Sequence, residues 1–391
     1  MSNSNSNNET GVTRRQAFQS AIGLAGLAAP AYNKGRYRLF ADSDTEYASR
    51  TIELVGRSTV IDMLSPFAIS PSLSDKLLLH PETFTPADLE QRRSSGIRVF
   101  HIAIGNGGPD VYTESLQFFG LWNGFIAQHG QDLVRIDTPA SFDLLNGNKK
   151  IGVLLGLQNS EHFRTPDDVD FFHSLGQRVS QLTYNTRNYI GNGSTERHDE
   201  GISDFGVAII QRMNKVGMVV DVSHCGDQTT LDAFEFSKKP VLITHANCRA
   251  LDNHPRCKTD EAIKKMAATG GVMGVTAVRM FVKASEPTTI NDVLDHFDHV
   301  VKLTSVEHVG IGSDSDLLGY DKMPPKENKQ LRAAYKSTYA FREKIDIEGL
   351  DHPKRVFDLT AGLIRRNYND QDIELILGGN FKRVLSQIWT T

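Results

Sequence analysis

The 391-residue sequence is poor in several features that would each indicate a class of protein. It has three cysteines, Cys225, Cys248 and Cys257, which lack zinc-knuckle spacing and cannot all pair, so a disulfide framework does not stabilise the fold. It has no run of about 20 apolar residues, which argues against a membrane-spanning helix. Its formal net charge of −4 provides no basic surface, so we expect no nucleic acid as a partner.

The first 31 residues differ in composition from the rest of the chain. Residues 1–11 are polar and of low complexity, and Arg14, Arg15 and Phe18 then precede a weakly apolar stretch of alanine and glycine. This order resembles a twin-arginine export signal with a small-residue cleavage site at residues 29–31, and the alternative is an ordinary amphipathic N-terminal helix. We therefore expect residues 1–31 to be the signal, and residues 32–391 to form one exported domain, periplasmic or otherwise outside the cytoplasm.

Short apolar segments alternate with helical patterns over most of the remaining chain. The eight segments are Thr59–Leu64, Arg98–Ala103, Ile151–Leu157, Val179–Thr183, Met218–Val222, Val241–Thr244, Gly271–Thr276 and His308–Gly312. They are continuous rather than alternating in hydrophobicity, as strands buried on both faces are. This count predicts an α/β fold, a (β/α)8 TIM barrel, with extra C-terminal helices at Val356–Arg366, Asp370–Leu377 and Asn380–Trp389 outside it. A doubly wound open sheet would need a glycine-rich nucleotide turn, and residues 105–108 lack the third spaced glycine.

Two consecutive predicted strands each end at a histidine, His224 and His245. In a parallel barrel, residues just past the carboxyl ends of the strands converge on one pocket. Two imidazoles delivered there can share a metal ion. The alternative is that each histidine caps its own strand through nearby backbone groups.

Other polar residues follow neighbouring strands and would lie around the same mouth. Gln158 follows the third strand, Tyr184 the fourth and Asp314 the eighth, while Arg256 sits in a proline-bounded loop beyond the sixth. An aspartate can move a proton beside a metal-polarised carbonyl, and an arginine can bind a carboxylate bidentately. The alternatives are loop capping for Asp314 and a surface cation for Arg256.

Several spaced motifs resemble those of the membrane dipeptidase (renal dipeptidase) family. They are Asp221-Val222-Ser223-His224, the segment from Thr244 to Leu251, His254-Pro255-Arg256, the segment from Gly310 to Asp316, and the segment from Gly378 to Leu385. The resemblance runs from about Arg50 to Trp389. It implies a barrel of metal-dependent hydrolases that cleave dipeptides, often with D-residues at the carboxyl side, and a tendency to form homodimers.

The same resemblance assigns roles to residues and also exposes three departures. It implies that His224 and His245 bind zinc, that Arg256 holds the dipeptide carboxylate, and that Asp314 handles the proton. The family's strand-one histidine and aspartate, however, correspond to Leu64 and Pro66, whose side chains cannot ligate a metal. Its bridging glutamate corresponds to Gln158, and its substrate-contacting histidine corresponds to Tyr184. One zinc ion is therefore expected, on His224, His245 and Gln158, with Glu161 as a substitute carboxylate if its loop is remodelled.

These observations favour an exported metallo-dipeptidase acting on a dipeptide-like small molecule. A second hypothesis is a catalytically impaired barrel of the same family that acts as a binding or maturation module, which the strand-one losses support. A third, a metal-independent barrel lyase, is weaker because no activated lysine or paired carboxylates stand out.

Overall fold

The computed structural model describes residues 36–38, 46–105, 107–145 and 150–389, so the expected export signal lies outside the described residues. The chain forms two compact units, residues 1–53 and 54–391. In the first unit, β1 (Arg36–Arg38) pairs antiparallel with β2 (Glu46–Ala48), and helix α2 (Ser49–Arg57) begins at its end.

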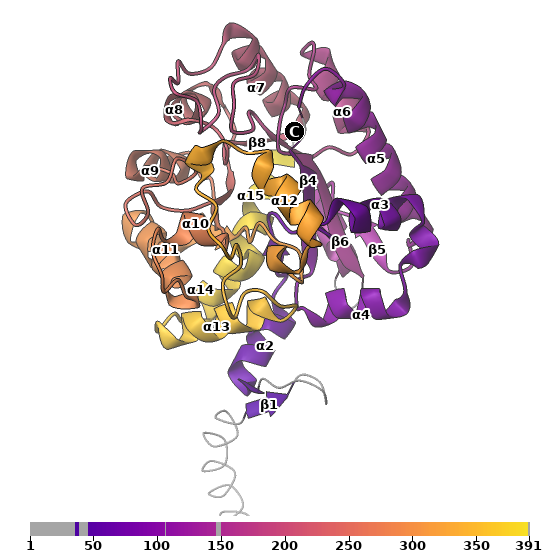
Figure 1. The fold of residues 1–391 in the computed structure, drawn as a ribbon, viewed down its shortest axis with the longest axis vertical. Helices are drawn as coiled ribbons and strands as arrows, with labels where there is room; N and C mark the ends of the chain where they lie inside the picture. Colours follow the sequence, from indigo (N-terminus) through magenta and orange to yellow (C-terminus); the bar gives the residue numbers. More distant parts are fainter. Residues whose placement is uncertain (1–35, 39–45, 106, 146–149, 390–391) are drawn as a thin grey trace, which may run out of the picture. The chain divides into compact units, whose positions relative to one another are not determined.

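The second unit is a (β/α)8 barrel, as the sequence predicts (Figure 1). Its eight parallel strands are β3 (Ile61–Asp62), β4 (Val99–Ile104), β6 (Ile151–Leu157), β7 (Val179–Gln181), β8 (Val219–Asp221), β9 (Ile243–Ala246), β10 (Met273–Val275) and β11 (Val309–Ile311). The ring closes between β8 and β9, where the amide of Val222 donates to Leu242 O at 3.0 Å and the amide of Leu242 donates to Val220 O at 2.9 Å. An unpredicted short strand, β5 (Leu133–Arg135), pairs with the start of β6.

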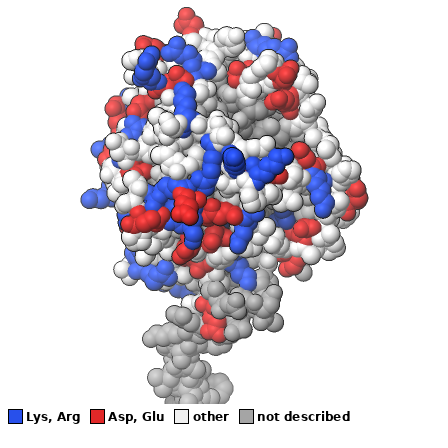
Figure 2. Space-filling view, in the orientation of Figure 1, with Lys and Arg blue, Asp and Glu red and all other residues white. Residues whose placement is uncertain are grey.

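Helices follow most of the barrel strands and cover the outside of the ring. They are α4 (Pro86–Ser94), α5 (Val111–Gln128), α6 (Asp167–Ser174), α7 (Asp204–Val216), α8 (Asp227–Phe236), α9 (Asp260–Ala268) and α11 (Ile290–Leu303). Shorter helices in the loops are α3 (Pro71–Leu79), α10 (Arg279–Val282) and α12 (Pro325–Ala333). No helix in the described ranges is long and apolar enough to cross a membrane. On the face shown in Figure 2, acidic and basic side chains are interspersed.

Helix α7 shows how local sequence fixes the boundaries of the elements that lead to the site. The side chain of Ser203 accepts a hydrogen bond from the amide of Gly206 and caps the start of the helix. Gly217 ends it with φ at 79°, a left-handed conformation that glycine adopts without steric cost. The chain then enters β8 directly, so these two signals place the strand that leads to His224.

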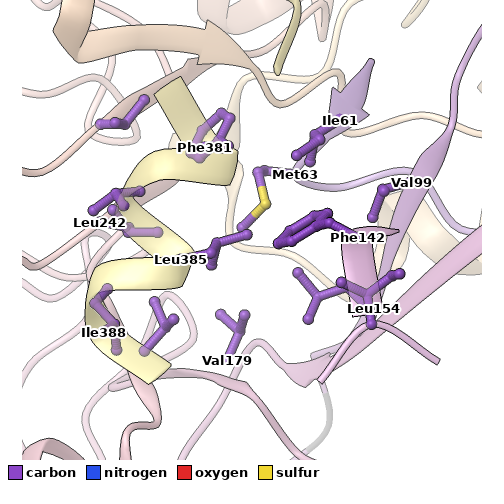
Figure 3. Packing of buried hydrophobic residues seen from close by; sticks show 14 of the residues in the cluster. Ile61, Met63, Val99, Phe142, Leu154, Val179, Leu242, Phe381, Leu385 and Ile388 are labelled. Atoms are coloured by element: carbon purple, nitrogen blue, oxygen red, sulfur yellow. The ribbon is translucent and has the colours of Figure 1, made fainter. Parts of the chain in front are cut away.

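The C-terminal helices α13 (Arg355–Arg365), α14 (Asp370–Glu374) and α15 (Asn380–Trp389) follow the barrel. Unlike the expected position outside the ring, α15 closes its amino-terminal end. Figure 3 shows Phe381, Leu385 and Ile388 on this helix turned toward residues at the starts of the strands, such as Val179. The core of the unit therefore lies at this end of the barrel, and the opposite end is left for polar side chains.

Candidate functional site

The two predicted histidines meet at the carboxyl ends of β8 and β9. Their Nε2 atoms lie 3.0 Å apart, and their ring centroids are separated by 5.0 Å. Both side chains are buried, with at most 1% of their surface exposed. The structure thus brings His224 and His245 together, and it aims the same ring nitrogen of each toward the other.

Hydrogen bonds at the opposite ring nitrogens define the tautomer of each histidine. Nδ1 of His224 lies 2.7 Å from Asn185 Oδ1, which can only accept, so this nitrogen carries the hydrogen. Nδ1 of His245 lies 2.8 Å from Thr244 Oγ1. The Thr244 hydroxyl gives its own hydrogen to Asp221 Oδ2 at 2.6 Å, so it accepts from the imidazole. Each Nε2 atom therefore carries a lone pair and no hydrogen.

Two lone pairs that face each other at 3.0 Å repel unless a cation lies between them. A proton is disfavoured, because burial and then the nearby charge of Arg256 hold the pKa of both His224 and His245 well below 6.5. Neutral imidazoles with Nε2 free and Nδ1–H held by a neighbour are the form in which histidine binds a metal. The pair therefore fits one metal ion.

The other half of the expected metal centre does not fit a second ion. Leu64 is buried at the end of β3 and Pro66 follows it, so this strand presents no ligand. Gln158 lies just past β6, where its Nε2 donates to Ala103 O at 3.1 Å; its neutral amide oxygen is a poor bridge between two cations. Glu161 turns away to the amide of Gly108, at 3.4 Å, and does not replace the missing carboxylate. Within the described parts of the chain, no three His, Cys, Asp or Glu side chains are grouped to hold a metal.

Asp314 follows β11 in a left-handed conformation, with φ at 57°, which aspartate tolerates better than most residues. It keeps part of its surface accessible, although protein atoms surround the carboxyl group. This burial raises the pKa of Asp314 to about 7, against the opposing influence of Arg256 and of a hydrogen bond from the Tyr320 hydroxyl. The carboxyl can therefore gain or lose a proton near neutral pH.

A buried ion pair fixes the backbone around Asp314. Asp62, the one residue retained from the family's strand-one motif, accepts from the amide of Ser313 at 2.8 Å and from its hydroxyl at 2.6 Å. Arg355 lies 3.1 Å from Asp62 and also donates to Ser315 O at 3.0 Å. Asp62 is thus a structural group that joins the ends of β3 and β11. Asp316 is structural as well, because its carboxylate accepts from three backbone amides of residues 69, 318 and 319.

Arg256 lies behind the histidine pair rather than on a surface loop. Its side chain is 0% exposed, and its guanidinium donates to the backbone carbonyls of Ser223 and His245. The Nε hydrogen has no acceptor, and among the described residues no carboxylate lies within ion-pair distance. A buried cation without an anion is costly, so this position favours a bound carboxylate.

Tyr184 covers one face of the histidine pair. Its ring stacks on His224 with centroids 4.2 Å apart and an interplanar angle of 20°. The ring also lies against Gly105, where an added Cβ atom would come within 2.3 Å of Tyr184 Cε2, so a larger residue at position 105 would displace the ring. Burial raises the pKa of the phenol well above 10, and its hydroxyl lies 2.6 Å from that of Tyr335. Tyr184 is therefore a fixed, neutral hydrogen-bonding group.

The structure adds several residues that the sequence analysis did not single out. Asn185 and Thr244 orient the two histidines, and Tyr320, Tyr335 and Tyr339 surround Asp314 and Arg256. A compositional signal existed for the tyrosines, because three of the ten in the chain fall within residues 320–339. No comparable signal distinguishes Asn185 from the other asparagines of its loop.

Comparisons with known proteins find relatives in sequence and in fold. The uncharacterized dipeptidase C965.12 of Schizosaccharomyces pombe is 28% identical over 283 residues, which cover 70% of this chain but only 62% of that protein. The crystal structure of an amidohydrolase from Pseudomonas aeruginosa has a TM-score of 0.74 and 27% identity, covering 87% of this chain and 99% of the other.

A metallo peptidase from Rhodobacter sphaeroides, solved with a phosphinate mimic of the dipeptide L-Ala-D-Ala, shares the fold with a TM-score of 0.67 and 17% identity, covering 85% of this chain and 99% of that one. The family model for membrane dipeptidases matches residues 82–331 and 341–391, well over half of the chain. This chain belongs to the membrane dipeptidase family, peptidase family M19.

Proposed function

We propose that this protein is a metallo-dipeptidase that hydrolyses the peptide bond of dipeptides with one metal ion, zinc by family precedent, held by His224 and His245. The observation that carries the proposal is the pair of Nε2 lone pairs 3.0 Å apart, each fixed by a hydrogen bond at Nδ1. Gln158 is the protein group that would add an oxygen donor, with the remaining positions left for water and substrate. Leu64 and Pro66 leave no second ion in this proposal.

The residues around the pair divide the chemistry among them. When bound, the ion would act as a Lewis acid that polarises the amide carbonyl and the attacking water. Asp314, with a pKa of about 7, takes one proton from the water as it attacks and returns it to the leaving amine as the C–N bond breaks. The fixed hydroxyl of Tyr184 donates to a substrate carbonyl oxygen, as the family's histidine does at this position.

The carboxyl end of the substrate is assigned to Arg256. Its buried, unpaired guanidinium has a free Nε hydrogen, and a carboxylate there would neutralise it at short range. The bound L-Ala-D-Ala mimic in the Rhodobacter sphaeroides relative supports dipeptides as the substrate class and D-residues at the carboxyl side.

A second candidate function is a binding or maturation module without catalysis. The loss of donors at Leu64 and Pro66, with Gln158 in place of a carboxylate, favours it. Lys258, the buried lysine near the site, does not support the hypothesis of a metal-independent lyase. Burial lowers the pKa of Lys258 to about 8, but its ammonium donates to Cys225 O at 2.8 Å and Thr230 Oγ1 at 3.0 Å.

Metal analysis and dipeptide hydrolysis separate these functions. The purified protein is expected to hold about one ion per chain and to lose it in the His224→Ala variant. A panel of L,L- and L,D-dipeptides should be cleaved, and Arg256→Ala should lose activity mainly through a raised KM. Metal-free protein that is indifferent to His224→Ala, together with no turnover of any dipeptide, would establish the binding module instead.

We also propose that the protein acts outside the cytoplasm after twin-arginine export. The support is the order of the polar leader, Arg14-Arg15, Phe18 and the weakly apolar stretch in residues 1–31. A homodimer, which the family resemblance suggests, stays a prediction.

A further inference from the structure

A surface segment that follows the last barrel strand reaches back over the histidine pair. It comprises residues 325–340, which begin with α12, and none of the residues of α12 is buried. Polar contacts hold it at its two ends: Ser70 Oγ donates to Glu327 Oε2 at 2.6 Å, and Lys336 Nζ lies 3.3 Å from Glu196 Oε1. Between these contacts, Leu331, Tyr335 and Tyr339 pack with the apolar cluster around Phe281, so polar contacts and apolar packing together hold the segment.

Tyr335 is the residue of this segment that contacts the site. Its hydroxyl is 2.6 Å from that of Tyr184, whose ring lies on His224. Tyr335 also packs on Tyr339, with ring centroids 4.4 Å apart. Tyr339 is buried against Phe281 and anchors the segment, whereas Tyr335 is only partly buried.

A cavity of about 330 Å³ borders Tyr184 and Tyr335 on the outer side of their hydroxyl contact. Tyr184 and Tyr335 both line it, together with Gly105, Thr195 and Leu331. We call it the outer cavity. Tyr184 lines the outer cavity and stacks on His224, so a molecule that moves from the cavity to His224 must displace Tyr184, whose hydroxyl is held by that of Tyr335.

Residues 332–340 are also the part of this region that departs from the family. The family model matches residues 82–331 and 341–391 and leaves these nine residues between the two stretches. A segment that contacts the site but is not matched by the family model can determine a property that differs between members of the family.

We propose that Tyr335 is a specificity-determining residue that closes the site over a bound dipeptide and excludes longer substrates. The proposal rests on the proposed function for its substrate class. With Tyr335 in place, a group that extends past Tyr184 meets a hydrogen-bonded ring. Without the ring, the Tyr184 hydroxyl loses its partner and the outer cavity widens beside it, so Tyr184 can turn away from His224 and make room for one further residue or an N-acyl group.

The first test uses the metal-free protein and needs no activity. Diethyl pyrocarbonate acylates neutral imidazole nitrogens, and peptide mapping by mass spectrometry gives the labelling rate at His224. His224 should be labelled roughly tenfold faster in Tyr335→Ala than in the wild type. The labelling rate follows the fraction of molecules in which the site is open to the reagent. Tyr335→Phe, which loses only the hydroxyl contact, should fall between them. Tyr189→Ala, at a side chain that is 78% exposed, is the matched control and should leave the rate unchanged.

The second test compares a dipeptide with the tripeptide that extends it by one amino-terminal alanine. Tyr335→Ala should raise the ratio of tripeptide to dipeptide kcat/KM by roughly tenfold or more, whereas Tyr335→Phe should leave the ratio close to wild type. Equal labelling of His224 in wild type and Tyr335→Ala would overturn the proposal, as would an unchanged ratio. If the wild type cleaves no dipeptide, the proposed function fails, and the labelling rates still decide whether Tyr335 closes the site.

Discussion

The imidazoles of His224 and His245 are held in place by different means. The Thr244 hydroxyl that holds His245 is itself bound to Asp221, and Asp221 also accepts from the hydroxyl of Ser223 at 2.6 Å. His224 depends on one amide group, Asn185, which comes from the loop after a different strand. The orientation of His224 is therefore the more sensitive of the two to a single substitution.

Replacing Asn185 with glycine should weaken metal binding without disturbing the fold. Asn185 has φ at 59°, a conformation in which glycine is unstrained, so the change removes only the acceptor for Nδ1 of His224. Loss of such an orienting partner typically costs roughly 10–100-fold in metal affinity. Competition titration of Zn²⁺ against a chromophoric chelator would measure it.

Two further variants make this result specific. Asn185→Asp keeps an acceptor and tolerates the backbone conformation, so it should retain affinity. Asn367→Gly changes another asparagine at positive φ, 65°, at the end of α13, and should leave affinity at the wild-type value. Equal affinities for all three variants would show that Asn185 does not orient the ligand.

The proton transfer proposed for Asp314 predicts that the reaction depends on pH. Its pKa of about 7 means that the carboxylate needed to accept a proton from water forms only as the pH rises through neutrality. We expect kcat/KM for a dipeptide to increase with pH through an inflection near 7, and Asp314→Asn to abolish most activity at every pH. A profile without an inflection between pH 6 and 8 would assign the proton transfer to another group.

The same carboxyl group affects stability with a known sign. Its folded pKa of about 7 lies above the ordinary value of 3.8, so protonation favours the folded state. The stability that the neutral form provides is present below pH 3.8 and is lost as the pH rises to 7. In the metal-free protein, Asp314→Asn should therefore exceed the wild type in free energy of unfolding by up to roughly 2–4 kcal/mol at pH 8, and by much less at pH 4.

At the scale of elements, the sequence was sufficient for the barrel strands but not for what closes them. Continuous apolar runs such as residues 151–157 predict buried parallel strands, because a strand that is covered on both faces needs apolar side chains on both. The sequence could not predict where α15 packs. An amphipathic helix has one apolar face whether it packs on the outside of the barrel or across its end. Asn185 and Tyr335 were missed for a related reason: their partners are 39 and 151 residues away.

The closure of the barrel by α15 predicts a large stability change that leaves the site intact. Phe381 is 0% exposed in the cluster at the amino-terminal end of the strands, so Phe381→Ala should cost about 3–5 kcal/mol of unfolding free energy. Denaturant titration would measure this cost. Gln387→Ala, at an exposed position of the same helix, should change stability by less than about 0.5 kcal/mol. Zinc affinity of folded Phe381→Ala should match the wild type, because the histidines lie at the other end.

At the scale of the whole molecule, the two histidines that the family resemblance assigns to a metal lie together, whereas the residue kept from the strand-one motif is structural. β8 and β9 lead to His224 and His245, whereas β3 contributes Asp62, which pairs with Arg355 and accepts hydrogen bonds from Ser313. Restoring Leu64→His and Pro66→Asp alone is therefore not expected to add a second ion, because Gln158 still lacks the charge to bridge two cations. Metal content should remain near one per chain in that double variant and rise only when Gln158→Glu is added.

We expect the location of the molecule to depend on residues 1–31, separately from the barrel. Twin-arginine export carries folded proteins, which suits a chain whose three cysteines are all buried as free thiols and whose metal could be bound before transport. Replacing both Arg14 and Arg15 with lysine keeps the charge but removes the guanidinium pair, so the protein should stay in the cytoplasm at full length. Cell fractionation of a Gram-negative host would show this, with Arg365→Lys, an exposed position in α13, as the control that is still exported. Export of the double-lysine variant at the wild-type level would mean that residues 1–31 are not a twin-arginine signal.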